Sequence, residues 1–127
     1  MSDWSAEELS MVASADELEI APLRADGSQR RYVPVWVVRV GDDLYVRSYR
    51  GRDGAWYRSA VGQREGRIRA GGVERAVAFE PDGTDPQAVD EAYRTKYARY
   101  GGSYLDPMLR PEATETTLRL APADQRP

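Results

Sequence analysis

The chain has 127 residues, of which 41% are hydrophobic, and this length fits one domain over residues 1–127. It contains no cysteine and no histidine, which excludes disulfides and thiolate catalysis and removes the commonest metal ligand and general base. We therefore expect no metal site. The formal charge is −3 and no basic block stands free of acidic residues, so we expect no nucleic-acid partner.

The N-terminal residues are acidic, and no apolar run is long enough to span a bilayer. These features predict a cytoplasmic protein with no membrane partner. The basic residues are almost all arginine, with Lys96 the only lysine. Arginine suits two-point recognition of anions, but the bias can equally reflect the base composition of the genome.

The first predicted element is a short helix from Ala6 to Ala13. Ser5 and Glu8 have the spacing of a capping box, in which each side chain bonds the backbone of the other residue. Residues 17–24 then alternate between apolar and charged, which predicts a half-buried strand. Because Pro22 is best tolerated at a sheet edge, we expect this to be an edge strand.

The segment Tyr32–Val40 is apolar on both faces of a predicted strand, so both faces must be covered. A sheet closed into a barrel covers one face, and a helix or a second subunit must cover the other. This segment is the main sequence evidence for a homodimer.

The stretch Leu44–Arg58 has the highest concentration of aromatic rings and guanidinium groups. At strand spacing, Tyr45, Arg47 and Tyr49 share one face and the opposite face points to the core. A cation between two rings can pair with a carboxylate or phosphate and support a flat ring. The glycines of residues 51–54 permit a backbone anion site. The alternative is an exposed loop with solvated arginines and a Tyr-Arg-Tyr dimer surface.

Residues 55–63 read as a short helical turn or loop. The clearest hairpin follows over residues 66–80, with Gly71-Gly72 as a two-residue turn and Arg69 opposite Glu74. A proline-started helix is then predicted from residue 85 to residue 100, with an aromatic stripe that we interpret as packing. Residues 113–122 supply the last strand.

Six predicted strands and two helices give an α+β pattern that resembles the split β-barrel of flavin- and deazaflavin-dependent oxidoreductases, a group that includes pyridoxamine-phosphate-oxidase-like proteins. More narrowly, VPVWVVRVGDDLYVRSYRGRDGAWYR and GRIRAGG resemble the small bacterial family called domain of unknown function 2255. This resemblance covers roughly Trp4 to Phe79 and the helix after it. It implies a six-stranded antiparallel split β-barrel, with a short N-terminal helix, a helix in the C-terminal half and a pocket at a dimer interface.

In the deazaflavin reductases, a Gly-Arg-Lys-Ser-Gly loop and a Trp-Tyr-x-Asn segment help to build the cofactor pocket. Arg24, Gly27 and Ser28 resemble the first motif without its lysine. Residues 56–59 resemble the second motif, with Ser59 where asparagine is expected.

The resemblance implies an oxidoreductase-like protein that binds flavin mononucleotide (FMN) or the deazaflavin F420 and acts on a small molecule. The alternative is a cofactor-free enzyme or small-molecule binding protein that uses the same pocket, with tyrosine or aspartate as acid or base. The missing lysine favours this alternative. A third interpretation makes the Arg-Tyr surface a dimer interface only. The candidate residues are Arg47, Ser48, Arg50 and Arg52 for the cofactor phosphate, Trp36 and Trp56 for the ring, and Tyr57 and Arg58 for catalysis on the substrate.

Overall fold

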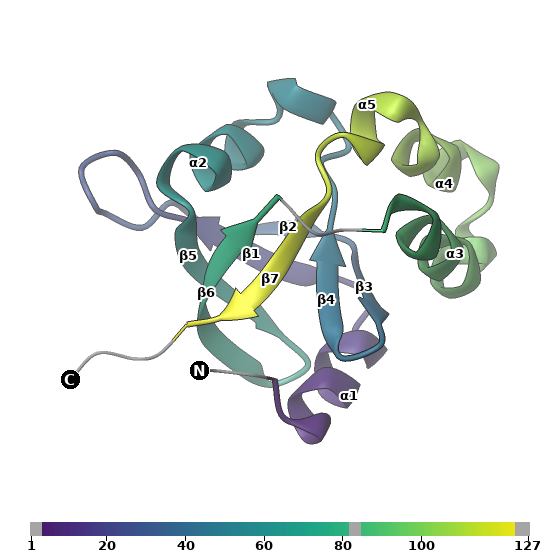
Figure 1. Cartoon of the computed structure of the whole chain (residues 1–127), viewed down its shortest axis with the longest axis horizontal. Helices are drawn as coiled ribbons and strands as arrows, with labels where there is room; N and C mark the ends of the chain where they lie inside the picture. The colour runs from purple at the N-terminus through teal and green to yellow at the C-terminus, as the bar shows by residue number, and fades with distance from the viewer. Residues whose placement is uncertain (1–3, 82–84, 124–127) are drawn as a thin grey trace.

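The computed structural model describes residues 4–81 and 85–123, which form one antiparallel sheet and several helices around it (Figure 1). The strands are β1 (Leu18–Pro22), β2 (Val33–Val35), β3 (Val37–Val40), β4 (Asp43–Val46), β5 (Glu65–Ala70), β6 (Val73–Glu80) and β7 (Leu118–Pro122). The α-helices are α1 (Ala6–Ser14), α2 (Ala55–Gln63), α3 (Pro86–Tyr97), α4 (Gly102–Leu109) and α5 (Pro111–Thr114). Two 3-10 helices, η1 (Gly51–Asp53) and η2 (Ala98–Tyr100), complete the elements of this part of the chain.

The seven strands of the described residues are ordered β2-β1-β5-β6-β7-β4-β3. The two outermost strands, β2 and β3, are consecutive in the chain and only Trp36 separates them. The sheet therefore curls into a nearly closed barrel. Figure 1 shows α3, α4 and α5 together on one side of this barrel, with α1 and α2 at opposite ends of the view. None of the helices within residues 4–81 and 85–123 has the length and apolar character needed to cross a membrane.

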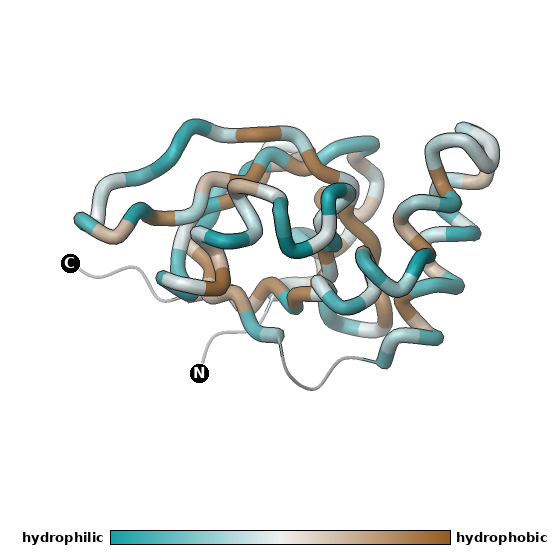
Figure 2. Tube along the Cα trace, turned by 90° about the horizontal axis from the view of Figure 1, so that it is seen from above, coloured by the Kyte–Doolittle hydropathy of each residue, from teal (hydrophilic) through white to brown (hydrophobic). Residues whose placement is uncertain are grey.

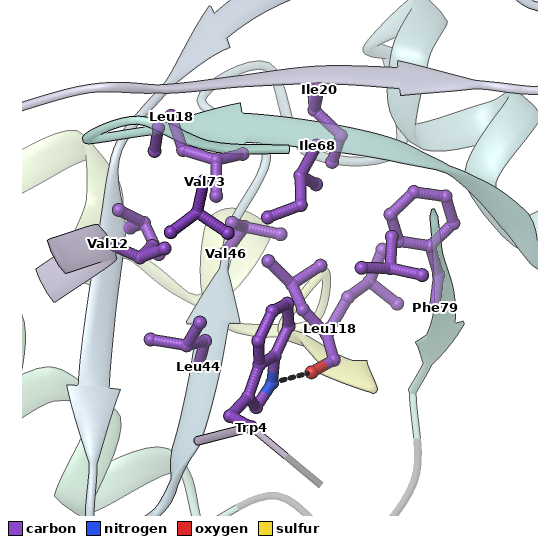
Figure 3. Close-up of a cluster of buried hydrophobic side chains, with 14 of the residues drawn as sticks. Trp4, Val12, Leu18, Ile20, Leu44, Val46, Ile68, Val73, Phe79 and Leu118 are labelled. Carbon is purple, nitrogen blue, oxygen red and sulfur yellow. Dashed lines mark hydrogen bonds between the residues drawn. The ribbon is translucent and has the colours of Figure 1, made fainter. Parts of the chain in front are cut away.

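The main core fills the barrel, where apolar side chains of every second strand position meet (Figure 3). Figure 2 shows hydrophobic and hydrophilic residues interspersed along the chain trace. Helix α1 closes one end of the barrel, and its predicted capping box between Ser5 and Glu8 is confirmed. Just before this helix, the buried Trp4 donates its indole N–H to the carbonyl oxygen of Leu120 at 2.8 Å. This bond fastens the start of the chain to β7.

A second core lies outside the barrel, between β3, β4 and the helices α3 and α4. Val37 points into the barrel core, whereas Val38 is fully buried in this second core under Tyr93 and Tyr97 of α3. The chain's own helix therefore covers the second face of the apolar segment. These residues do not require a second subunit, and the homodimer stays a prediction.

Three details of the expected sheet are corrected by the structure. The sheet has seven strands and not six, because Trp36 interrupts the apolar segment and divides it into β2 and β3. Strand β1 is not at an edge, since it pairs with β2 on one side and β5 on the other. Pro22 is tolerated there because it stands at the last position of the strand. Strand β4 ends at Val46, so residues 47–49 leave the ladder earlier than the alternation suggests.

Other expectations are confirmed. The β5–β6 hairpin has the predicted register, with Ala70 opposite Val73 and Arg69 opposite Glu74. Residues 55–63 form the helix α2, and α3 begins after the N-cap Asp85 with Pro86 in its first turn. The helix in the C-terminal half is followed by further helical turns, α4 and α5, that were not expected.

The guanidinium of Arg47 is buried where α3, α4 and the start of β7 meet. It donates to Asp90 Oδ1 at 2.5 Å, Thr117 Oγ1 at 2.9 Å and the carbonyl oxygens of Met108 at 2.9 Å and Pro86 at 3.2 Å. Its side chain is 0% exposed, whereas that of Asp90 is 22% exposed. The planar guanidinium has five N–H donors. It can therefore bond at the same time to acceptors on α3, on α4 and just before β7.

We predict that Arg47→Ala lowers the free energy of unfolding by about 3–5 kcal/mol, because it leaves a carboxylate and two carbonyls without their donor. Urea unfolding followed by circular dichroism measures this change. The matched control is Arg39→Ala, which removes an exposed arginine of the neighbouring strand β3 and should cost within about 0.5 kcal/mol. Equal small losses in both variants would contradict a structural role for Arg47.

Lys96 and Tyr97 connect α3 to β3 by hydrogen bonds to the backbone of Val37. Lys96 is half-buried and donates Nζ to the carbonyl oxygen of Val37 at 2.7 Å. Burial lowers the pKa of Lys96 to about 8, while Asp16 acts in the opposite direction. Tyr97 is fully buried, accepts a hydrogen bond from the Val37 N–H and lies 2.8 Å from the carbonyl oxygen of Asp16.

We predict that Lys96 makes the free energy of unfolding rise between about pH 8 and pH 9.5. In this window the unfolded chain keeps a proton on Lys96 that the folded chain releases, because the folded pKa is about 8 and the ordinary value is 10.5. In Lys96→Met the rise should be absent. Since Lys96 is the only lysine, the comparison isolates one group. A rise of the same size in both proteins, from urea unfolding at each pH, would contradict the prediction.

Candidate ligand-binding site

An aromatic cleft opens beside the break between β2 and β3. Its volume is 260 Å³, and four aromatic side chains contribute to its walls. Tyr49 and Tyr104 are 62% and 64% exposed, so they stand at the mouth and not in the core. The residues that line this aromatic cleft are Glu17, Pro34, Val35, Trp36, Arg47, Tyr49, Trp56, Tyr104 and Met108.

A second cavity of 450 Å³, which we call the arginine pocket, lies directly beside the aromatic cleft. The two cavities share Pro34, Tyr49 and Trp56 as lining residues. The arginine pocket adds Arg24, Arg30, Arg31, Val33, Ser48, Arg50, Gly54 and Ala55. A ligand with a flat apolar part and an anionic part could therefore occupy both cavities across one shared wall.

The guanidinium groups of the arginine pocket come from two segments that the sheet brings together. Residues 24–31 form the loop between β1 and β2, and Arg50 follows β4. Asp26 orders the loop by accepting hydrogen bonds from the N–H and the hydroxyl of Ser28, which lower the pKa of its carboxyl. Within residues 4–81 and 85–123, no carboxylate forms an ion pair with Arg24, Arg30, Arg31 or Arg50. The pocket thus concentrates positive charge on a chain whose net charge is −3.

The N-terminus of α2 faces the same pocket. Its N-cap is Gly54, and no side chain caps the first N–H groups of this nine-residue helix. Beside it lies Ser48, which is 1% exposed and whose Oγ has no hydrogen-bond partner among the described residues. A Cβ on Gly54 would come within 2.5 Å of that Oγ, so only glycine lets the helix start so close to the hydroxyl. Free N–H groups, a free hydroxyl and the positive end of a helix are what a phosphate group binds.

Five of the eight predicted site residues line these cavities. Trp36 lines the aromatic cleft, Trp56 lines both cavities, and Ser48 and Arg50 line the arginine pocket. Arg47 also lines the aromatic cleft, but its internal bonds use most of its N–H groups.

Three other predicted residues lie outside the lining of both cavities. Arg52 is exposed and pairs with Glu115 at 3.6 Å. Tyr57 packs edge-on against Trp56 with ring centroids 6.1 Å apart, and Arg58 is exposed on α2. The predicted catalytic role of Tyr57 and Arg58 stays a prediction.

Sequence reasoning missed several lining residues. Arg30 and Arg31 are adjacent, and this pair of basic residues was a usable signal for an anion site. Tyr104 comes from α4, which was not predicted, and Glu17 comes from the residue before β1. Tyr104 and Glu17 come close to Trp36 only because the sheet curls. The alternation of apolar and polar residues along a strand does not predict that curl.

Several comparisons identify the fold. The heme storage protein HutZ from Vibrio cholerae superposes with a TM-score of 0.64 at 12% identity, covering 98% of this chain and 93% of that one. An F420 reductase gives 0.58 at 15% identity, covering 91% and 92%. A putative 5-nitroimidazole antibiotic resistance protein from Bacteroides thetaiotaomicron gives 0.58 at 17% identity, covering 95% and 81%. These likenesses establish a split-barrel-like fold. No protein with a curated description matches the sequence.

The family model described as an uncharacterized protein conserved in bacteria, DUF2255, matches residues 8–120. That range includes strands β1 to β6, the first part of β7, and the residues that line the aromatic cleft and the arginine pocket. The chain therefore belongs to the DUF2255 family of bacterial proteins.

Proposed function

We propose that this protein binds a phosphorylated planar cofactor of the flavin or deazaflavin type and serves as an oxidoreductase for a small molecule. The observation that carries the proposal is the shared wall between the aromatic cleft and the arginine pocket. FMN has the matching form, a flat ring system joined by a short chain to a phosphate. F420 joins a similar ring to a phosphate diester.

The phosphate belongs at the start of α2 in this proposal. The unpartnered Ser48 hydroxyl and the uncapped N–H groups after Gly54 offer donors in one place. Arg50 and Arg31 add exposed guanidinium groups that can bind phosphate oxygens in pairs. Arg47 does not bind the phosphate in this proposal, because Asp90 already compensates its charge.

The ring belongs in the aromatic cleft. Trp36 and Trp56 form apolar walls, and the exposed Tyr49 and Tyr104 can close over a flat ring at low entropic cost, since they have few rotatable bonds. Such a cofactor supplies the hydride chemistry, which is why the lack of histidine and cysteine does not oppose the proposal. The chain's own residues bind, orient and shield the ring.

The F420 reductase with a similar fold supports this ligand class by its name. At 15% identity, the likeness itself shows only a similar fold. Heme, named for HutZ, suits the site less well. Heme iron is commonly held by histidine or cysteine, which this chain lacks.

The alternative is a cofactor-free enzyme or binding protein for a small anionic aromatic molecule. The departures from the deazaflavin motifs favour it, since Arg24 and Ser28 stand in a loop without the expected lysine. Both functions use the same two cavities, so a direct comparison of ligands separates them.

We predict that FMN binds more tightly than riboflavin, which has the same ring and no phosphate. Charge-assisted hydrogen bonds contribute about 1.5–3 kcal/mol, so the ratio of dissociation constants should be about tenfold to a hundredfold. Arg50→Ala should reduce this ratio, and Tyr104→Ala should weaken both ligands alike. Calorimetric titration with FMN, riboflavin and F420 measures these affinities.

The matched control is Arg52→Ala, two residues from Arg50 and also exposed, but paired with Glu115 outside both cavities. It should leave the ratio unchanged at physiological salt. Lack of binding by FMN, riboflavin and F420 in the parent would refute the cofactor proposal. Binding of inorganic phosphate or an aromatic phosphate that Arg50→Ala weakens would then favour the alternative.

We also propose a homodimer. The reason is the pair of exposed rings at the mouth of the aromatic cleft, because the apolar strand segment is already covered by the chain's own helix. Tyr49 and Tyr104 are the most exposed large apolar side chains of the described residues. Tyrosine is enriched in the cores of protein interfaces. Light scattering on a sizing column should give twice the chain mass of 14.2 kDa, and a monomer at micromolar concentration would remove the proposal.

A further inference from the structure

We propose that Trp36 and Tyr100 form a one-electron relay, which carries oxidising equivalents from the aromatic cleft to the protein surface with Tyr97 stacked behind Trp36. The relay requires only a one-electron oxidant at the aromatic cleft, of which a photoexcited flavin-type ring is one example.

The ring positions define the route. Trp36 lines the aromatic cleft and stacks on Tyr97 with centroids 3.9 Å apart and planes 2° apart. Tyr100 lies with its ring centroid 5.6 Å from that of Trp36 and 6.0 Å from that of Tyr97, and it is 38% exposed. Rings this close exchange electrons rapidly by tunnelling. One step beyond Trp36 therefore reaches solvent.

Trp36 and Tyr97 form a close parallel stack. Their centroids are 3.9 Å apart, closer than the roughly 4.5–7 Å that is typical of aromatic pairs. Overlap of this kind spreads the positive charge of an oxidised indole over two rings. It thereby makes Trp36 easier to oxidise.

Proton transfer determines which residue carries the stable radical. A tyrosine forms a stable neutral radical only when its phenolic proton leaves. The Tyr97 hydroxyl faces the carbonyl oxygens of Asp16 and Val37, which are too weakly basic to take it, and burial raises the pKa of Tyr97. Tyr100 is exposed and can release its proton to water, with the Arg99 guanidinium 3.3 Å from its oxygen.

The oxidant takes one electron from the Trp36 indole and becomes reduced by one electron. Tyr100 passes one electron to Trp36, which restores the neutral indole, and releases its phenolic proton to water. The net products are the reduced oxidant, a Tyr100 radical and one proton.

Pulse radiolysis with azide radicals tests the relay on the cofactor-free full chain. The experiment uses a Trp56→Phe background, because Trp56 and Tyr57 form another close pair of this kind. The indole radical band should decay as the tyrosine radical band rises, at a rate that does not depend on protein concentration. Adding Tyr100→Phe should abolish that phase. The matched control Tyr104→Phe removes a more exposed tyrosine that has no described ring contact with Trp36, and should retain it.

An unchanged phase in folded Tyr100→Phe, or its loss in Tyr104→Phe as well, would overturn the relay. Circular dichroism establishes that each variant is folded. Azide radicals need no bound cofactor, so this test stands apart from the titrations with FMN. Transfer in a protein that binds none of FMN, riboflavin and F420 would refute the cofactor proposal alone, and binding of one of them without transfer would refute the relay alone.

Discussion

The buried guanidinium of Arg47 is the interaction on which the arrangement of the C-terminal half depends. It ties Pro86 and Asp90 of α3, Met108 of α4 and Thr117 before β7 to the end of β4. A buried charge of this kind tolerates no loss of its partners, because an unpaired ion inside a protein is strongly destabilised. The helices are thereby fixed beside the barrel.

This constraint also shapes the cleft. The same network holds Met108, and with it α4, in the position where Tyr104 borders the aromatic cleft. The other walls come from the Trp36 break and from α2. The cleft is therefore a product of the contacts between the barrel and its helices. A residue with a structural role, Arg47, controls its shape without having to hold a ligand.

Local sequence patterns predicted the local structure well. The capping box at Ser5, the glycine turn of the β5–β6 hairpin and the proline start of α3 each depend on neighbours a few residues apart. The division of the apolar segment at Trp36 was missed, since a run of β-branched residues gives no sign of where its ladder stops. The position of β1 inside the sheet was also missed, because Pro22 stands at its final residue.

The site was less predictable for a physical reason that Arg47 illustrates. Its place between two tyrosines was compatible with an anion from a ligand or from the chain, and only folding brings Asp90 into contact, 43 residues away in sequence. Ser48 gives the opposite case. Alternation assigned its side chain to the core face, and the structure buries it, but beside Gly54 and an uncapped helix it keeps a free hydroxyl.

The contrast between these two residues favours Ser48 over Arg47 as a ligand-binding residue in the proposed function. A buried hydroxyl without a partner costs stability, whereas the guanidinium of Arg47 already has its acceptors within the chain. The cost is removed when a ligand supplies an acceptor, and the helix N-terminus beside it makes an anionic acceptor the best match. In the proposed function, the unsatisfied Ser48 hydroxyl at the start of α2, and not the guanidinium of Arg47, is therefore where a phosphate would gain most from binding.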